Sequence, residues 1–213
     1  MKTILFQGDS ITDVGRNRER NDMLGWGYPR LVEAQLGFDH PGVYNFQNRG
    51  IGGNRILDLY ARIVKDILNI APDYLSILIG VNDIWHGLDD ANGTGIQRFE
   101  KVYDMLLTEL QEELPDTKIM IMEPFVLRGP ATDNREDQPD RWELFSSGVY
   151  QVAAIVKGLA EKHGVKFIPL QKKFNEAEKL APATYWLFDG VHPSAKGHEL
   201  IKRQWLKAFN EIK

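Results

Sequence analysis

The chain has 213 residues, 43% of them hydrophobic and 10% aromatic, so it can bury one substantial core. Its 26 Lys and Arg are scattered among 30 Asp and Glu, and the net charge of −4 argues against a nucleic-acid partner. Cysteine is absent, which excludes disulfides and thiolate metal sites, and no apolar run approaches the roughly 20 residues that span a bilayer. We therefore expect one domain over residues 1–213, cytoplasmic, with no membrane partner and no metal or other cofactor.

Short β-rich runs alternate with helical patterns along the chain. The predicted strands are Thr3–Gln7, Val43–Gln47, Tyr74–Ile79, Lys118–Met122 and Val165–Leu170. Apolar residues recur at helical spacing over Ile56–Ile67, Phe99–Leu110 and Ala195–Ile212, and His163-Gly164 ends a further helix. The polar stretch Arg128–Arg141 reads as a surface excursion. Near-continuous apolar strands between one-sided helices indicate an α/β fold with a parallel sheet covered on both faces.

Four unusual stretches follow predicted strands or precede the last helix. They are Gly8-Asp9-Ser10, Asn48–Asn54 ("NRGIGGN"), Gly80–Asp83 ("GVND") and Phe188–Ser194 ("FDGVHPS"). Ligands bind beyond the carboxyl ends of the strands in open parallel sheets, at the crevice where strand order reverses. We expect these four stretches to meet at that rim.

The residue types in these stretches are those that acyl transfer requires. A serine hydroxyl needs a base within hydrogen-bond reach and a third group that orients the base. We assign Ser10 as nucleophile, His192 as base and Asp189 as its orienting acid. The tetrahedral intermediate also needs donors for its oxyanion, and the candidates are the Ser10 N–H, a backbone N–H of the Gly52-Gly53 turn and the Asn82 amide.

In this order and at these intervals, the four stretches resemble the motif blocks of the SGNH hydrolases, also called the GDSL esterase/lipase family. The resemblance spans nearly the whole chain and assigns the oxyanion glycine to Gly53, the second glycine of "IGGN". The first block reads GDSI where the family name gives GDSL, a change of one branched aliphatic residue. The resemblance implies a flavodoxin-like three-layer fold with a five-stranded parallel sheet, a hydrolytic serine and no metal.

Each of these residues also has a structural interpretation. Ser10 and Asn82 are ordinary helix-capping residues, the Gly52-Gly53 pair is common in turns, and Asp189 with His192 can precede a capped helix. Asp9 suits an Asx-type bond that holds the turn better than it suits substrate contact. The presence of all four stretches together favours catalysis.

The substrate is the least determined property. Aromatic and hydrogen-bonding residues near the rim suit a sugar ring with a small acyl site. The candidate substrate-binding residues are Asp9, Arg49, Asn54, Arg55, Trp85, His86 and Trp186. The chain looks most similar to carbohydrate acetylesterases of the acetyl-xylan or acetyl-xylo-oligosaccharide type, which implies a small-molecule substrate. A lysophospholipase, an acyl-thioesterase, a short-chain arylesterase and a non-catalytic sugar-binding module are the alternatives, and a homo-oligomer remains open.

Overall fold

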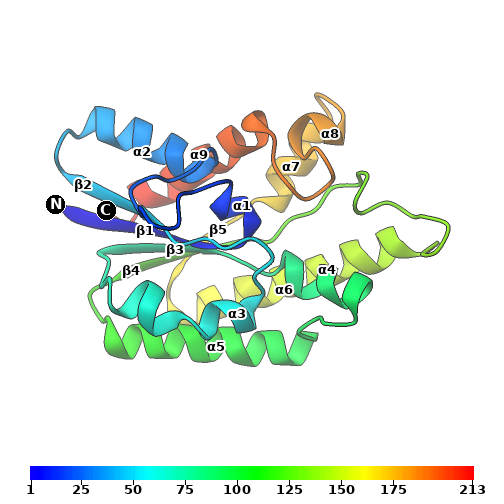
Figure 1. Ribbon diagram of the computed structural model, residues 1–213, viewed down its shortest axis with the longest axis horizontal. Helices are drawn as coiled ribbons and strands as arrows, with labels where there is room; N and C mark the ends of the chain where they lie inside the picture. Colours follow the sequence, from blue (N-terminus) through cyan, green and yellow to red (C-terminus); the bar gives the residue numbers. More distant parts are fainter.

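Five parallel strands form the centre of the computed structural model, which describes residues 1–213. The strands run in the order β2-β1-β3-β4-β5 (Figure 1). Their bounds are β1 Lys2–Gly8, β2 Tyr44–Asn48, β3 Tyr74–Leu78, β4 Lys118–Met122 and β5 Lys166–Ile168. All five predicted strands are therefore confirmed, and the α/β class with a flavodoxin-like parallel sheet is confirmed as well.

Helices cover both faces of this sheet (Figure 1). One layer contains α2 (Tyr28–Asp39) and α9 (Ala195–Asn210), which pack against each other, with α7 (Gln171–Glu178) and α8 (Ala183–Trp186) beside them. The other layer contains α3 (Ile56–Tyr60), α4 (Val81–Asp90), α5 (Ile96–Glu113) and α6 (Arg141–His163). The short α1 (Ser10–Asp13) follows β1 directly. No helix combines the length and the apolar character needed to cross a bilayer.

Strand residues alternate between two apolar cores, one on each face of the sheet. Ile4 and Phe6 point into the core that contains Trp205 of α9, whereas Leu5 between them belongs to the core under α5. All of these side chains are fully buried. Burial on both faces is the reason that the strands read as continuous apolar runs in the sequence.

The predicted helix over Ile56–Ile67 is wrong in its middle. The structure has the short α3, a turn, and then a π-helical segment, η1 (Val64–Leu68), closed by a bond from the Asn69 N–H to the Val64 carbonyl. The break lets Arg62 and the buried Asp66 reach the ends of the central strands, where the Arg62 guanidinium donates to Gln7 and to the Arg49 carbonyl. The spacing of apolar residues in the sequence cannot predict such contacts between buried polar side chains.

The Arg128–Arg141 segment leaves the body of the molecule as an extended loop between β4 and α6 (Figure 1). Its tip is exposed, as expected for a surface excursion, but Thr132 and Arg141 are fully buried. The excursion is therefore anchored at both of these residues.

The helices α2, α4, α7 and α8 were not predicted from the sequence.

Candidate active site

The site lies where the order of the strands reverses, between β1 and β3. Ser10 follows the end of β1 and Asn82 follows the end of β3, and the two strands are direct neighbours. Gly8 closes β1 at φ +154°, and a Cβ on it would lie only 2.3 Å from the Leu78 carbonyl oxygen. A glycine at this position allows the two strand ends to approach closely enough for their loops to share one site.

Ser10, His192 and Asp189 form one hydrogen-bonded chain. The Ser10 Oγ lies 2.9 Å from His192 Nε2, and His192 Nδ1 lies 2.7 Å from Asp189 Oδ2. The other carboxylate oxygen of Asp189 accepts the backbone N–H groups of Val191 and His192, at 2.9 and 2.7 Å. The carboxylate is thus fixed by three donors, and it holds the imidazole with Nε2 toward the serine.

The electrostatics of the pair agree with this geometry. The hydrogen bond that His192 donates to Asp189 raises the pKa of His192 above its usual value, against the opposing effect of partial burial. Burial acts to raise the pKa of Asp189, but the hydrogen bonds from the His192 ring and from the two backbone N–H groups outweigh it and hold the pKa below its usual value. At neutral pH Asp189 is a carboxylate beside an imidazole poised to take a proton.

Asp9, directly before the serine, is buried and caps α1. Its side chain is buried, and Oδ1 accepts the Ile11 N–H at 3.0 Å as the N-cap of α1. These contacts give no support to the prediction that Asp9 binds substrate, and the bond to Ile11 is the Asx-type bond of the alternative interpretation. Burial raises the pKa of Asp9 to about 7. This carboxyl stabilises the turn that carries Ser10.

Unpaired donors surround the serine. Neither the Ser10 N–H nor the Gly53 N–H has an acceptor within the protein, whereas the Gly52 N–H donates to Asp13 Oδ2 at 3.0 Å. The Asn82 amide gives one hydrogen to the Asn54 carbonyl at 3.1 Å and has a second one free. Two backbone N–H groups and one side-chain N–H thus remain available for an anionic oxygen.

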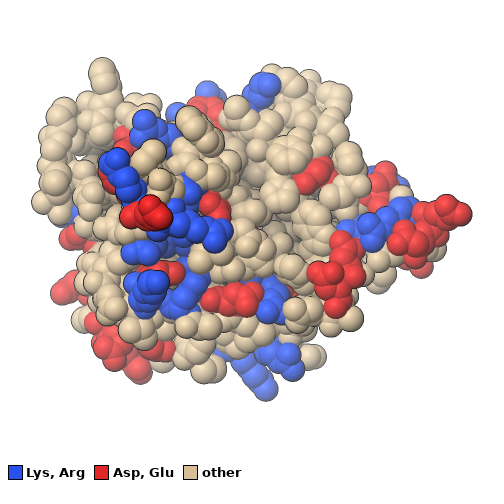
Figure 2. Space-filling model, viewed as in Figure 1, with Lys and Arg blue, Asp and Glu red and all other residues tan.

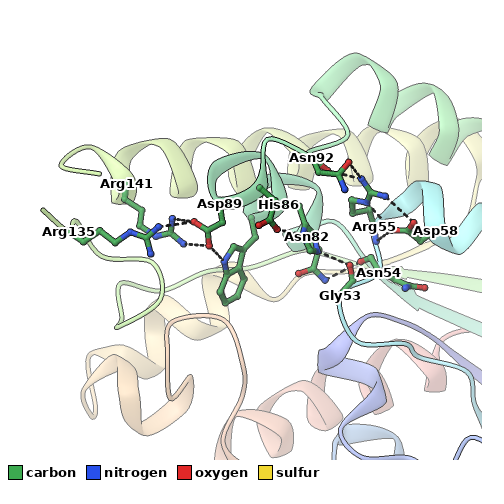
Figure 3. A network of polar contacts seen from close by, with 12 residues as sticks. Gly53, Asn54, Arg55, Asp58, Asn82, His86, Asp89, Asn92, Arg135 and Arg141 are labelled. Atoms are coloured by element: carbon green, nitrogen blue, oxygen red, sulfur yellow. Dashed lines mark hydrogen bonds and ion pairs between the residues drawn. The ribbon is translucent and has the colours of Figure 1, made fainter. Parts of the chain in front are cut away.

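Helix α4 holds the turn that contains Gly53 (Figure 3). The His86 Nε2 lies 3.0 Å from the Gly53 carbonyl oxygen, and its Nδ1 lies 3.0 Å from Asp90 Oδ2. Together with the bond from Asn82 to Asn54, this fastens two consecutive residues of the turn to one helix. Gly53 adopts φ +79°, which favours glycine at this position.

Trp85 of α4 stands beside the imidazole of His192. The two ring centroids are 5.8 Å apart, and the indole N–H donates to Asp89 Oδ2 at 2.7 Å. Asp89 in turn accepts from Arg141, at 2.6 and 3.1 Å, and from Arg135 (Figure 3). The excursion after β4 therefore fixes the orientation of an aromatic ring at the site.

Other candidate substrate-binding residues are occupied within the protein. The Arg55 guanidinium binds Asp58 and Asn92 (Figure 3). The Asn54 side-chain oxygen accepts from Arg62. The Arg49 Nη1 pairs with Asp66 at 3.2 Å. These three residues support the loops of the site, so the prediction that they bind substrate has no support from these contacts.

Trp186 lies in α8 and lines a separate hollow of about 550 Å³ between α7 and α9. None of the three residues of the hydrogen-bonded chain lines this hollow. The prediction that Trp186 binds substrate beside Ser10 therefore has no support from this hollow, although Trp186 is close to His192 in the sequence.

Three residues of the site were missed by sequence reasoning. Asp13 holds Gly52, Asp83 accepts the Ile56 N–H and the Thr94 hydroxyl, and the Phe188 ring stacks on His192 at 5.6 Å. Burial raises the pKa of Asp83 to about 7. All three lie within or next to the four stretches, so their position was a signal. The Gly52 and Ile56 N–H groups lie 39 and 27 positions from Asp13 and Asp83, whereas Phe188 and His192 belong to the same stretch.

Comparisons with known proteins agree with this arrangement. Residues 6–200 match the model of the GDSL-like Lipase/Acylhydrolase family. An acetylxylan esterase from Geobacillus stearothermophilus is 34% identical over 96% of this chain and 92% of its own length.

Solved structures give the same result. A GDSL-like lipase from Parabacteroides merdae superposes with a TM-score of 0.90 at 38% identity, covering 98% of this chain and 95% of its own. A crystal structure of an acetylxylan esterase from Geobacillus stearothermophilus gives a TM-score of 0.83 at 31% identity, covering 97% and 93%. The chain therefore belongs to the GDSL-like lipase/acylhydrolase family and is a carboxylic ester hydrolase.

Proposed function

We propose that this protein is a serine acetylesterase that removes acetyl groups from acetylated carbohydrates such as xylo-oligosaccharides. The observation that carries the proposal is the continuous chain from Ser10 through His192 to Asp189, with contacts of 2.9 and 2.7 Å. The similarity to an acetylxylan esterase over nearly the whole chain supports the substrate class.

In the proposed reaction His192 Nε2 takes the proton of the Ser10 hydroxyl as Oγ attacks the acetyl carbonyl carbon. Asp189 stabilises the resulting imidazolium, which then protonates the leaving sugar oxygen. A water molecule, activated by His192, hydrolyses the acetyl-enzyme and releases acetate. Each half-reaction uses the same base and returns it neutral.

The oxyanion of each tetrahedral intermediate would be bound by the Ser10 N–H, the Gly53 N–H and the Asn82 amide. The support is that the two backbone N–H groups and the second hydrogen of the Asn82 amide have no protein acceptor. Loss of one such donor costs about 3 kcal/mol of transition-state stabilisation, or more than a hundredfold in rate.

The test measures acetate release from acetylated xylose and xylo-oligosaccharides beside esters of increasing acyl length. We expect acetylated sugars to be hydrolysed far faster than octanoyl esters. Equal or reversed rates would favour a lysophospholipase or an acyl-thioesterase. Ser10→Ala should abolish turnover and labelling by a fluorophosphonate, whereas the matched control Ser147→Ala, an exposed serine on α6, should retain both.

A protein that binds sugars without catalysis would behave differently in the same experiment. It would release no acetate and would retain its ligand affinity after Ser10→Ala. Cytoplasmic location and assembly into a homo-oligomer stay predictions, which cell fractionation and light scattering test.

A further inference from the structure

A group of four arginines gathers next to the nucleophile. Arg16 and Arg18 come from the loop after α1, Arg49 follows β2 and Arg62 follows α3. Burial lowers the pKa of Arg16, the three other guanidiniums lower it further, and Asp13 opposes them. Figure 2 shows basic side chains crowded, with acidic ones among them, over the region where Figure 1 draws α1 and the loop that follows it.

Acidic partners neutralise only half of this charge. Asp13 pairs with Arg18 at 3.2 Å, and Asp66 pairs with both Arg49 at 3.2 Å and Arg62 at 2.9 Å. Four positive charges against two negative ones leave a local excess of two positive charges. The whole chain has a net charge of −4, so this excess runs against the overall balance.

Arg16 is the arginine with no carboxylate partner. The residue is only 8% exposed, and its Nε donates to the Gly50 carbonyl oxygen at 2.6 Å. Its Nη1 is buried without an acceptor, and so is the Nε of Arg49. Buried donors of a charged group are normally paired because an unpaired one is costly. Arg16 therefore adds a positive charge that no carboxylate of the protein pairs with.

This charge borders the reaction centre directly. A shallow hollow of about 370 Å³ is lined by Ser10, Asp13, Val14, Gly15, Arg16, Arg18 and Gly52. The aromatic rings of Trp85 and Phe188 lie instead around His192. The surroundings of the serine thus have an aromatic part and a cationic part, and the hollow with Ser10 belongs to the cationic part.

We propose that the hollow is a subsite for a carboxylate carried by the carbohydrate, so that the favoured substrates are acetylated oligosaccharides with a uronic acid substituent. This inference rests on the proposed function, because an acetyl group has no charge and the anion must then belong to the sugar. Arg18 is the exposed member of the group and meets the carboxylate, while Arg16 supplies fixed positive charge behind it.

The test compares kcat/KM for two acetylated xylo-oligosaccharides of equal length, one with a glucuronic acid side group and one without. The wild type should prefer the acidic substrate about fivefold, as expected for a partly exposed charge pair. Arg18→Glu should remove or invert the preference and Arg18→Lys should keep it. Arg98→Glu, an equal charge change on the exposed face of α5, should also keep it. Because the readout is a ratio, a general loss of activity cancels.

Salt gives a second readout. The preference should shrink when NaCl is raised to about 0.5 M, since salt screens exposed charges. Equal kcat/KM values for the two substrates in the wild type, or an unchanged ratio in Arg18→Glu, would overturn the subsite while leaving the acetylesterase proposal intact. Failure to deacetylate both oligosaccharides, with p-nitrophenyl acetate still cleaved, would overturn the proposed function itself.

Discussion

The substitution Asp189→Asn tests how the carboxylate controls the imidazole. In the wild type, Oδ1 accepts two backbone N–H groups and Oδ2 faces His192 Nδ1. An amide nitrogen cannot accept, so the asparagine oxygen must take the place beside the backbone N–H groups and its NH₂ must face Nδ1. A neutral imidazole then keeps its proton on Nε2, which points at Ser10 and can no longer act as a base.

The geometry sets the size of the effect. Loss of the carboxylate removes a charge-assisted bond to the imidazolium, about 2 kcal/mol, and the facing amide donor costs about 2 kcal/mol more by favouring the wrong tautomer. The sum of about 4 kcal/mol corresponds to roughly a thousandfold loss of kcat/KM. Asp189→Ala has only the first loss, roughly thirtyfold. Asparagine should therefore be the more damaging of the two substitutions.

The assay is kcat/KM on p-nitrophenyl acetate from pH 5 to pH 9. In the wild type the rate should rise with pH through one ionisation above about 6.5, because the base must be neutral and Asp189 raises the pKa of His192. Both variants should move this rise to lower pH. An asparagine variant as active as the alanine variant, or an unmoved pH profile, would refute the reasoning.

Three further substitutions test the supporting residues. His86→Ala removes the ring that contacts the Gly53 carbonyl, so kcat should fall about tenfold with KM nearly constant, measured by steady-state kinetics. Asp89→Ala leaves Arg141, whose side chain is 1% exposed, without its carboxylate and should cost about 3 kcal/mol of unfolding free energy in urea. Burial raises the pKa of Asp9 to about 7, so the folded state favours the protonated carboxyl. The free energy of unfolding should therefore fall as the pH rises from about 4 to 7. Asp9→Asn should flatten this pH dependence, measured by urea titrations at pH 5 and pH 7.5.

Each of these three predictions has a control variant or an outcome that would contradict it. An increase of KM at constant kcat in His86→Ala would indicate substrate binding instead of positioning. Asp137→Ala, on a carboxylate that also pairs with Arg135 but is 74% exposed, should leave stability within about 0.5 kcal/mol. An Asp9→Asn protein that keeps the full pH dependence would show that other groups, such as Asp83, account for it.

The sequence alone was sufficient for the five strands and the four site stretches. Strands buried on both faces appear as apolar runs, and the contact between Asp189 and His192 spans only three residues on one turn. The parallel arrangement then places every strand end at one rim, so the meeting of Ser10 and His192, 182 positions apart, followed from topology.

Only the tertiary structure decided which polar residues serve the scaffold. Arg55, Asn54 and Asp9 are residue types that often bind ligands, yet their hydrogen-bond partners lie within the protein. The contact from Arg62 to Gln7, which accompanies the break between α3 and η1, was likewise not predictable. A hydrogen bond between distant positions leaves no periodic trace in a single sequence, because it is set by how the elements pack and not by the local preferences of either residue.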